Sequence, residues 1–235
     1  TSIKNCSFID NYAAKTLLHI TIAKLSLENC YFLNNQGSLL ELVYSRTNIN
    51  LLSVSGHILN TTSKTRKEIL FPFLKCVYCE INIKKTVVEI SVSSKNSIVF
   101  ELAKAYFIAE ELSISSKSSG KSYTRHKFFS CENSNLLLSS SFFEDLHKEA
   151  IIFNKGLLKL AKCVFKPGKN IVLEPSTDFP SIIIFYSGQL FCLQSSFFGV
   201  SFSAIKIENA FGDNVEPNFF NISYCLFSEN IAKSG

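Results

Sequence analysis

The sequence has no methionine and no tryptophan, and it holds only nine glycines, five prolines and four aspartates among 235 residues. It also lacks the apolar run of about 20 residues that a membrane-spanning helix needs. Its longest candidates, such as Ser181–Tyr186, have the length of a strand. The chain starts at Thr1 without a basic-then-apolar signal segment, so we expect a fragment or a processed piece of a longer protein.

Basic residues concentrate in two segments, Ser63–Lys67 and Lys117–Lys127, and do not form a stripe. Nucleic-acid binders usually combine such a stripe with a recognisable module. We therefore expect no nucleic-acid partner and no membrane span. The apolar fraction of 46%, against 18% charged residues, is enough for a packed core.

Eight cysteines suit neither a small disulfide-stapled domain nor an obvious zinc site. The Cys76-Val-Tyr-Cys79 run has the spacing of a zinc or redox motif, but no second Cys-x-x-Cys or His pair follows at ligand spacing. Cys76 and Cys79 are therefore either a local disulfide or two buried thiols. We expect no metal site and no cofactor.

A short template recurs along the chain: apolar, any, apolar, two residues, cysteine or serine, any, phenylalanine. Copies begin at Leu25, Leu136, Leu158, Phe191 and Phe220. Apolar residues two apart have the period of a strand, whereas helical repeats need apolar positions at i, i+3, i+4 and i+7. The template predicts an inward ladder of Cys6, Phe8, Cys30, Phe32, Ser141, Phe143, Cys163, Phe165, Ser196, Phe198, Cys225 and Phe227.

An aliphatic block, the apolar pair and the Cys-x-Phe pair give three short strands per repeat. They predict an all-β, right-handed, single-stranded parallel β-helix of about eight to nine coils, forming one domain over residues 1–235. Asn5 and Asn29 stand at the bend before the cysteine, where asparagine tolerates the left-handed backbone. The main alternative, an immunoglobulin-like sandwich, would not repeat this template. Loop insertions are expected near residues 60–68, 115–127, 167–180 and 209–218.

The repeats resemble the pectin-lyase-like superfamily and, within it, the repeats of chlamydial polymorphic membrane proteins. Phe8-Ile-Asp-Asn11, Phe32-Leu-Asn-Asn35 and Phe227-Ser-Glu-Asn230 match the Phe-x-x-Asn signature of those repeats. Gly37-Ser-Leu-Leu40 and Ser203-Ala-Ile205 match their small-residue-plus-aliphatic signature loosely. The resemblance implies a β-helix with a surface-exposed adhesive or structural role.

The same superfamily contains polysaccharide lyases and hydrolases. Glycoside hydrolysis needs two carboxyl groups that face one sugar, yet among the aspartates only Asp145 stands beside another acid, Glu144. Glu41, Glu101 and Lys206 hold one strand position in different coils and are expected to face solvent. The histidines are scattered, at His19, His57, His126 and His147. We therefore predict no catalytic residues.

Asn5, Asn60 and Asn221 begin glycosylation sequons. The leading hypothesis is a non-enzymatic extracellular or cell-surface protein that presents loops or packs into a larger assembly or filament. Its expected partners are other subunits or the rest of a longer chain, and also glycans. Two alternatives are a carbohydrate-binding or polysaccharide-degrading β-helix module, and a cytosolic interaction scaffold with reduced cysteines and no glycan.

Overall fold

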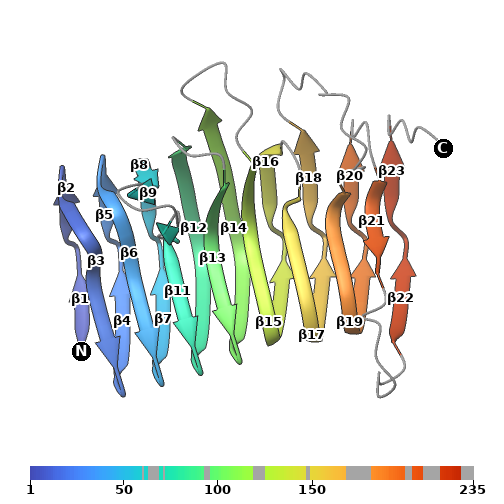
Figure 1. Cartoon of the computed structure of the whole chain (residues 1–235), viewed down its shortest axis with the longest axis horizontal. Helices are drawn as coiled ribbons and strands as arrows, with labels where there is room; N and C mark the ends of the chain where they lie inside the picture. The colour runs from blue at the N-terminus through green and yellow to red at the C-terminus, as the bar shows by residue number, and fades with distance from the viewer. Residues whose placement is uncertain are drawn as a thin grey trace.

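A computed structural model describes residues 1–59, 61–62, 69–70, 72–92, 96–118, 125–146, 149–167, 181–198, 203–208 and 218–228. The regular elements of these residues are β-strands, which wind into coils stacked along one axis (Figure 1). No helix among them is long and apolar enough to cross a membrane.

Each coil has three sides, and strands on the same side of successive coils pair with one another. The first side holds β1 (Ser2–Lys4), β4 (Lys24–Glu28), β7 (Arg46–Asn50), the first parts of β12 (Glu80–Val92) and β14 (Tyr106–Ser118), the last parts of β15 (Arg125–Ser139), β17 (Ile151–Ala161) and β19 (Ser181–Leu193), and β22 (Phe219–Ser223). The second side holds β2 (Ser7–Ile9), β5 (Tyr31–Leu33), β8 (Ser53–Leu59), the last parts of β12 and β14, β16 (Phe142–Leu146), β18 (Val164–Pro167), β20 (Ser196–Phe198) and β23 (Leu226–Ser228). The third side holds β3 (Tyr12–Thr21), β6 (Gln36–Val43), β11 (Leu74–Val77), β13 (Asn96–Ala103), the first parts of β15, β17 and β19, and β21 (Ser203–Ile207).

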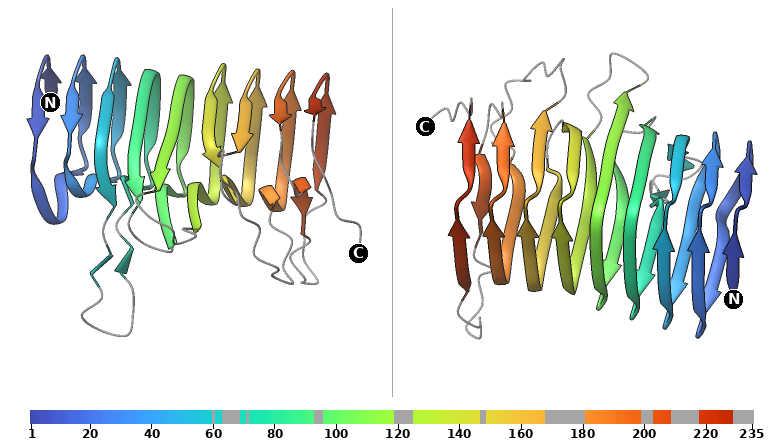
Figure 2. Two further views of the ribbon diagram at one scale, coloured as in Figure 1. Left: turned by 90° about the horizontal axis from the view of Figure 1, so that it is seen from above. Right: turned by 180° about the vertical axis from the view of Figure 1, so that it is seen from behind.

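All of these pairings are parallel, as the template predicts. One antiparallel pair, β9 (Thr61–Thr62) with β10 (Ile69–Leu70), lies within the insertion after β8. Figures 1 and 2 show the chain rising along one face and descending along the opposite face as it advances, which makes the coil right-handed. The predicted right-handed parallel β-helix is confirmed.

The core consists of ladders of inward side chains. The ladder on the second side runs through Phe8, Phe32, Val54, Val88, Ile114, Phe143, Phe165, Phe197 and Phe227. Its aromatic members stack nearly parallel: the ring centroids of Phe143 and Phe165 are 4.8 Å apart, and those of Phe165 and Phe197 are 4.9 Å apart. Stacked rings bury large apolar areas while keeping the favourable ring geometry.

The predicted ladder is correct except in one coil. Ser196 and Phe198 are half-buried, and the inward positions belong to Ser195 and Phe197, which are fully buried. The run Ser195-Ser-Phe-Phe198 fits the template in two registers that differ by one residue. Because Phe165 pairs with Phe197, the strand adopts the register in which Ser195 and Phe197 point inward. A slip of one residue turns every side chain of a strand to the opposite face.

The corner between the first and second sides contains a left-handed residue in each coil. Asn5 and Asn29 have φ values of 53° and 51°, as expected for asparagine at this bend. Other coils place residues without that preference at the equivalent position: Leu51, Lys85, Glu111, Ser140, Lys162, Gln194 and Tyr224. Coil stacking therefore imposes this conformation even where the local sequence does not favour it.

The Phe-x-x-Asn signature has a structural explanation at the corner between the second and third sides. Asn35 is buried, and its Oδ1 accepts hydrogen bonds from the backbone N and the Nδ2 of Asn11 at 3.0 and 2.8 Å. Asn35 Nδ2 donates to the carbonyl of Phe8 at 2.8 Å. The asparagines thus satisfy polar groups between neighbouring coils, as buried amides must. The third copy, Asn230, lies outside the described residues.

The predicted insertion ranges overlap described strands, and β9 lies inside the first of them. β14 continues through Ser118 and β15 begins at Arg125, so residues 115–118 and 125–127 of the predicted 115–127 loop are strand. Residues 60, 63–68, 168–180 and 209–217 lie outside the described residues. Three of the four insertions connect the second side to the third, as the strand order shows.

Candidate functional site

The corner between the third side and the next first side carries a row of left-handed residues whose side chains project outward. Ile22, Tyr44, Tyr78, Lys104 and Asn133 hold this position in successive coils, with φ between 48° and 55°. A left-handed residue directs the chain into a sharp turn. This corner, where the third-side strands end and the first-side strands begin, lies along the lower edge of the solenoid in Figure 1, and we call the row of residues the ridge.

A groove of about 740 Å³ runs beside this ridge. Its floor is built from the small residues that follow each ridge residue: Ala23, Ser45, Cys79 and Ala105. Its far wall is built from the next residues along the chain: Lys24, Arg46, Glu80, Tyr106 and Asn135. We call these residues, with the ridge, the corner groove.

The aromatic rings of the ridge are stacked on each other. Tyr44 and Tyr78 have ring centroids 4.9 Å apart and an interplanar angle of 9°. Lys104 Nζ lies 4.8 Å from the Tyr78 centroid and donates a hydrogen bond to the Tyr78 hydroxyl at 2.6 Å, and this hydrogen bond raises the pKa of Lys104. Tyr44 and Lys104 therefore pack against the Tyr78 ring, and a ligand in the groove would meet the edge and the hydroxyl group of Tyr78.

The charges of the corner groove are unequal. Arg46 and Glu80 form an ion pair at 2.5 Å across neighbouring coils. Lys24 and Lys104 add two further cations to the lining. The groove therefore carries an excess of positive charge, which favours an uncharged or anionic ligand rich in hydrogen-bonding groups.

Cys79 lines the groove, and of the two alternatives for Cys76 and Cys79 the disulfide is not present. All eight cysteines are free thiols. Cys79 Sγ donates to the carbonyl of Leu42 at 3.1 Å, while Cys76 faces the core between Leu42 and Leu102. The hydrogen bond from Cys76 lowers the pKa of Cys79 to about 7 and raises the pKa of Cys76. The prediction of two buried thiols is therefore the correct alternative.

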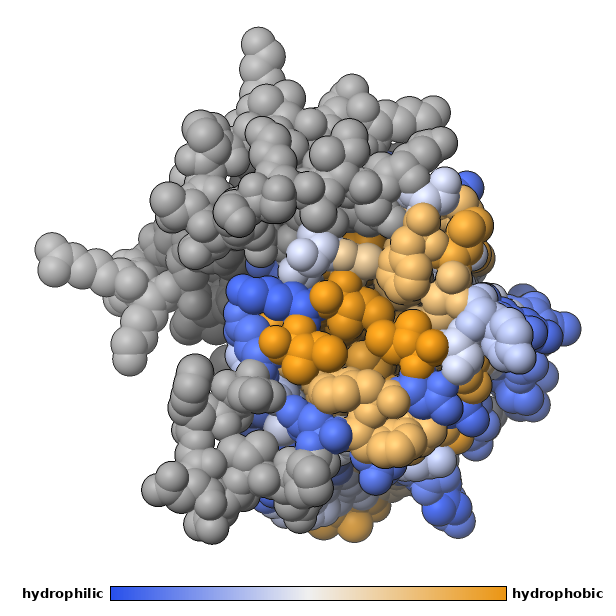
Figure 3. All heavy atoms as spheres, turned by 90° about the vertical axis from the view of Figure 1, so that its right-hand side faces the viewer, coloured by the Kyte–Doolittle hydropathy of each residue, from blue (hydrophilic) through white to orange (hydrophobic). Residues whose placement is uncertain are grey.

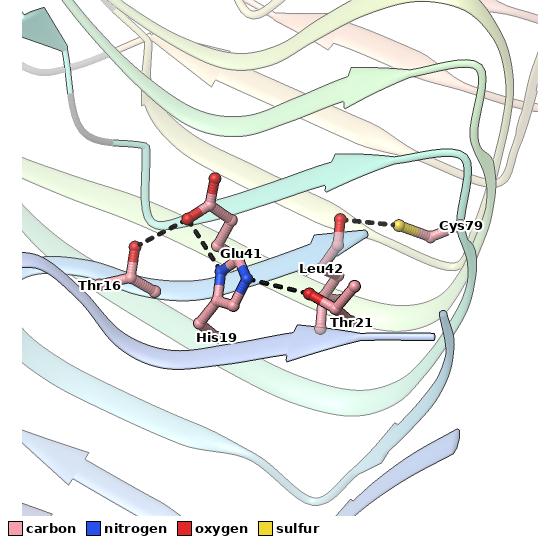
Figure 4. A network of polar contacts seen from close by, with 6 residues as sticks. All are labelled: Thr16, His19, Thr21, Glu41, Leu42 and Cys79. Atoms are coloured by element: carbon pink, nitrogen blue, oxygen red, sulfur yellow. Dashed lines mark hydrogen bonds and ion pairs between the residues drawn. The ribbon is translucent and has the colours of Figure 1, made fainter. Parts of the chain in front are cut away.

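A polar network on the outer face of the third side links the first two coils (Figure 4). His19 Nδ1 lies 3.1 Å from Glu41 Oε2, and its Nε2 lies 2.9 Å from Thr21 Oγ1. Thr16 Oγ1 donates to the same Glu41 oxygen at 3.4 Å. A hydroxyl, an imidazole and a carboxylate therefore stand in the order of a nucleophile relay, a grouping that the sequence did not predict.

The relay lies on a flat strand face whose backbone amides are already used. The amide of Ile22, next to Thr21, donates to the Val43 carbonyl at 3.0 Å. Acyl transfer needs donors free to stabilise an oxyanion. The network connects the first two coils through polar contacts, and the amide next to Thr21 is committed to strand pairing.

The outward positions predicted from the sequence share one ladder. Glu41 pairs with Lys75, which pairs with Glu101, and Lys206 stands on the same ladder in a later coil. Asp10 and Asp145 are left-handed corner residues with φ of 53° and 57°. Among the described residues, no three His, Cys, Asp or Glu side chains gather as a metal site would require.

The glycosylation sequons fall in different surroundings. Asn221 is exposed on β22, and its Oδ1 accepts a hydrogen bond from the Ser223 hydroxyl at 2.6 Å. Asn5 is exposed at a corner, and its Oδ1 accepts from Asn29 Nδ2 at 2.8 Å. Asn60 lies outside the described residues. Glycosylation at these asparagines stays a prediction.

The corner groove was not predicted, although the sequence contains a signal for it. The five coils that line the groove each carry a large residue, a small residue and then a polar or aromatic residue, as in Tyr44-Ser-Arg46 and Tyr78-Cys-Glu80. No protein-family model matches the chain, and no curated protein matches it in sequence.

Proposed function

We propose that the chain is a non-enzymatic structural or adhesive β-helix segment of the pectin-lyase-like type. It acts outside the cell and packs coil to coil against neighbouring subunits or further coils. Its partners recognise the open faces of the coil stack and the loops that leave it.

The observation that carries this proposal is the apolar face of the last described coil. Ile222 and Phe227 remain 43% and 48% exposed, although their ladder partners in the preceding coil, Cys192 and Phe197, are fully buried. Figure 3 shows the hydrophobic surface at this end of the solenoid. Such a surface, with the free edge of a parallel sheet, is a template for pairing with another strand.

The first coil offers a matching face. Ile3 and Phe8 stand on the same ladders as Ile222 and Phe227, and both are half-buried. A coil from a second copy placed against β22 and β23 would continue both ladders. Contacts of this head-to-tail kind generate open filaments when the rotation does not close.

Sedimentation velocity tests this packing directly. We expect the chain to associate as its concentration rises, and the double variant Ile222→Lys/Phe227→Lys to remain monomeric because a buried lysine would lose its hydration. Ile22→Lys is the matched control, since Ile22 is exposed at a corner and not on an end face. A wild-type chain that stays monomeric at high concentration contradicts end-to-end packing, and loss of association in the control indicates lateral contacts instead.

The corner groove favours a second candidate function, the binding of a glycan chain. Its lining positions recur coil by coil, although the residue at each position changes, and such an extended row of polar groups suits a chain-like ligand. A glycan array that compares the wild-type chain with the Tyr44→Ser/Tyr78→Ser variant tests glycan binding, and we expect the variant to lose it. Tyr224→Ser is the control, because Tyr224 is an exposed tyrosine that does not line the groove. Binding that survives in the double variant contradicts a role for the groove.

A further inference from the structure

Three cysteines at the corner between the first and second sides lean toward the preceding coil. Cys30 Sγ lies 3.5 Å from the carbonyl oxygen of Ile3, and Cys163 Sγ lies 3.5 Å from that of Leu138. Cys225 Sγ lies 3.2 Å from the carbonyl oxygen of Cys192. The contact is therefore a repeated feature of the template.

The residues that these cysteines face belong to one ladder of stacked, equivalent positions on the first side. That ladder runs through Ile3, Leu27, Ile49, Ile83, Ala109, Leu138, Leu160, Cys192 and Ile222. Cys30 and Cys163 thus face aliphatic side chains, whereas Cys225 faces a second thiol. The Sγ atoms of Cys192 and Cys225 are 3.5 Å apart.

We propose that Cys192 and Cys225 form a disulfide that fastens the last described coil to the coil before it. The sulfurs need to approach from 3.5 Å to a bond length of about 2 Å. Cys192 is fully buried and Cys225 is half-buried at the edge of the stack, so Cys225 has the freer side chain to close this gap.

The oxidant is a small-molecule disulfide, such as glutathione disulfide. The Cys225 thiolate attacks one sulfur of the oxidant, forms a mixed disulfide and releases one glutathione thiolate. The Cys192 thiolate then attacks the Cys225 sulfur and releases the second glutathione. Two protein thiols lose two protons and two electrons, and the oxidant becomes two glutathione thiols.

The second step is the slower one. Burial raises the pKa of Cys192, so its thiolate is scarce at neutral pH. Because the thiolate is the attacking species, closure of the disulfide should accelerate as the pH rises from about 7 to about 9.

The disulfide would join the last described coil, which contains β22 and β23, to the coil before it. β22 and β23 pair with the body of the solenoid on one edge, through β19 and β20. A link from Cys225 to Cys192 restrains this coil without changing its exposed apolar face. The link is independent of end-to-end packing, so either property can hold without the other.

Peptide mapping tests the proposal. Trypsin cleaves after Lys169, Lys206 and Lys233, which places Cys192 and Cys225 in separate peptides. After equilibration with glutathione disulfide and acid quenching, we expect these two peptides to appear joined, in a chain that runs as a monomer on a non-reducing gel. Reduction should separate them.

Cys163→Ser is the matched control, because Cys163 faces Leu138 and its loss should leave the joined peptides unchanged. Cys225→Ser should leave Cys192 fully alkylatable. The proposal is overturned if both cysteines of the wild-type chain remain alkylatable, if Cys225 stops as the glutathione adduct at pH 9, or if the disulfide joins two chains.

Discussion

The middle of the solenoid and its outer regions differ in whether the second side of the coil carries aromatic side chains. In the outer regions the second side carries rings, as at Phe32 and Phe165, and in the later coils the third side carries Phe153 and Phe185 as well. In the middle, that ladder holds Val54, Val88 and Ile114. The rings move to the other sides there, as Phe73, Phe100, Phe107 and Phe129.

The transferred rings form a cluster of their own. Phe100 and Phe129 stack with centroids 4.9 Å apart, and Phe107 meets Phe129 edge-on at 5.6 Å. In later coils the ladder of Phe100 and Phe129 continues through Ile151 and Ile183, and the second side becomes aromatic again. Rings from the first and third sides therefore help to fill the middle coils, as the close packing of a protein core requires.

The largest expected effect is the loss of a buried ring in either region. Phe100→Ala and Phe165→Ala should each lower the free energy of unfolding by about 3–5 kcal/mol, because both leave a large cavity. Urea denaturation followed by circular dichroism measures the change. A cost below about 1 kcal/mol for Phe100→Ala alone would show that the middle coils do not depend on their displaced rings.

The opposite change tests whether the middle coils are already full. Val88→Phe restores the template at the second side, where Val88 is fully buried. It should destabilise by about 1–3 kcal/mol, since an additional ring overpacks a filled core. We expect Phe100→Leu to recover part of this loss in the double variant. A stabilising Val88→Phe would instead mean that the middle coils leave space on their second side.

The smallest effect is expected at the end of the stack. Phe32→Ala should cost about 3–5 kcal/mol, because Phe32 is fully buried. Phe227→Ala should cost less than half of that, although both residues hold the same template position, because Phe227 is 48% exposed. Equal costs, measured under identical urea conditions, would show that Phe227 is covered in solution.

The repeat made the fold predictable because strand period and template together define the inward ladders. Cys30, Phe32, Ser141 and Phe165 are buried as predicted. The middle coils do not match the template clearly, because Val54, Val88 and Ile114 stand where the template has phenylalanine. Their place on the ladder follows from the pairing of neighbouring coils, which one short segment of sequence does not reveal.

The error at Ser196 and Phe198 had a further consequence. The same one-residue slip placed Cys192 on the outer face, whereas it faces the core. Because of that slip, the sequence did not predict that Cys192 lies close to Cys225, which is 33 residues later in the chain. Cys76 and Cys79 were recognised as a candidate pair only because they are close in sequence. The corner groove was missed for a related reason, since its walls come from residues that meet only when coils stack.

Electron microscopy of the protein purified from its native source tests most directly whether the open coil faces are used for assembly. We expect filaments or ordered arrays in which the solenoid axis follows the direction of growth, because Ile222 and Phe227 then meet the ladders of another coil. Dispersed single particles, at concentrations where the isolated chain is folded, would contradict the assembly role.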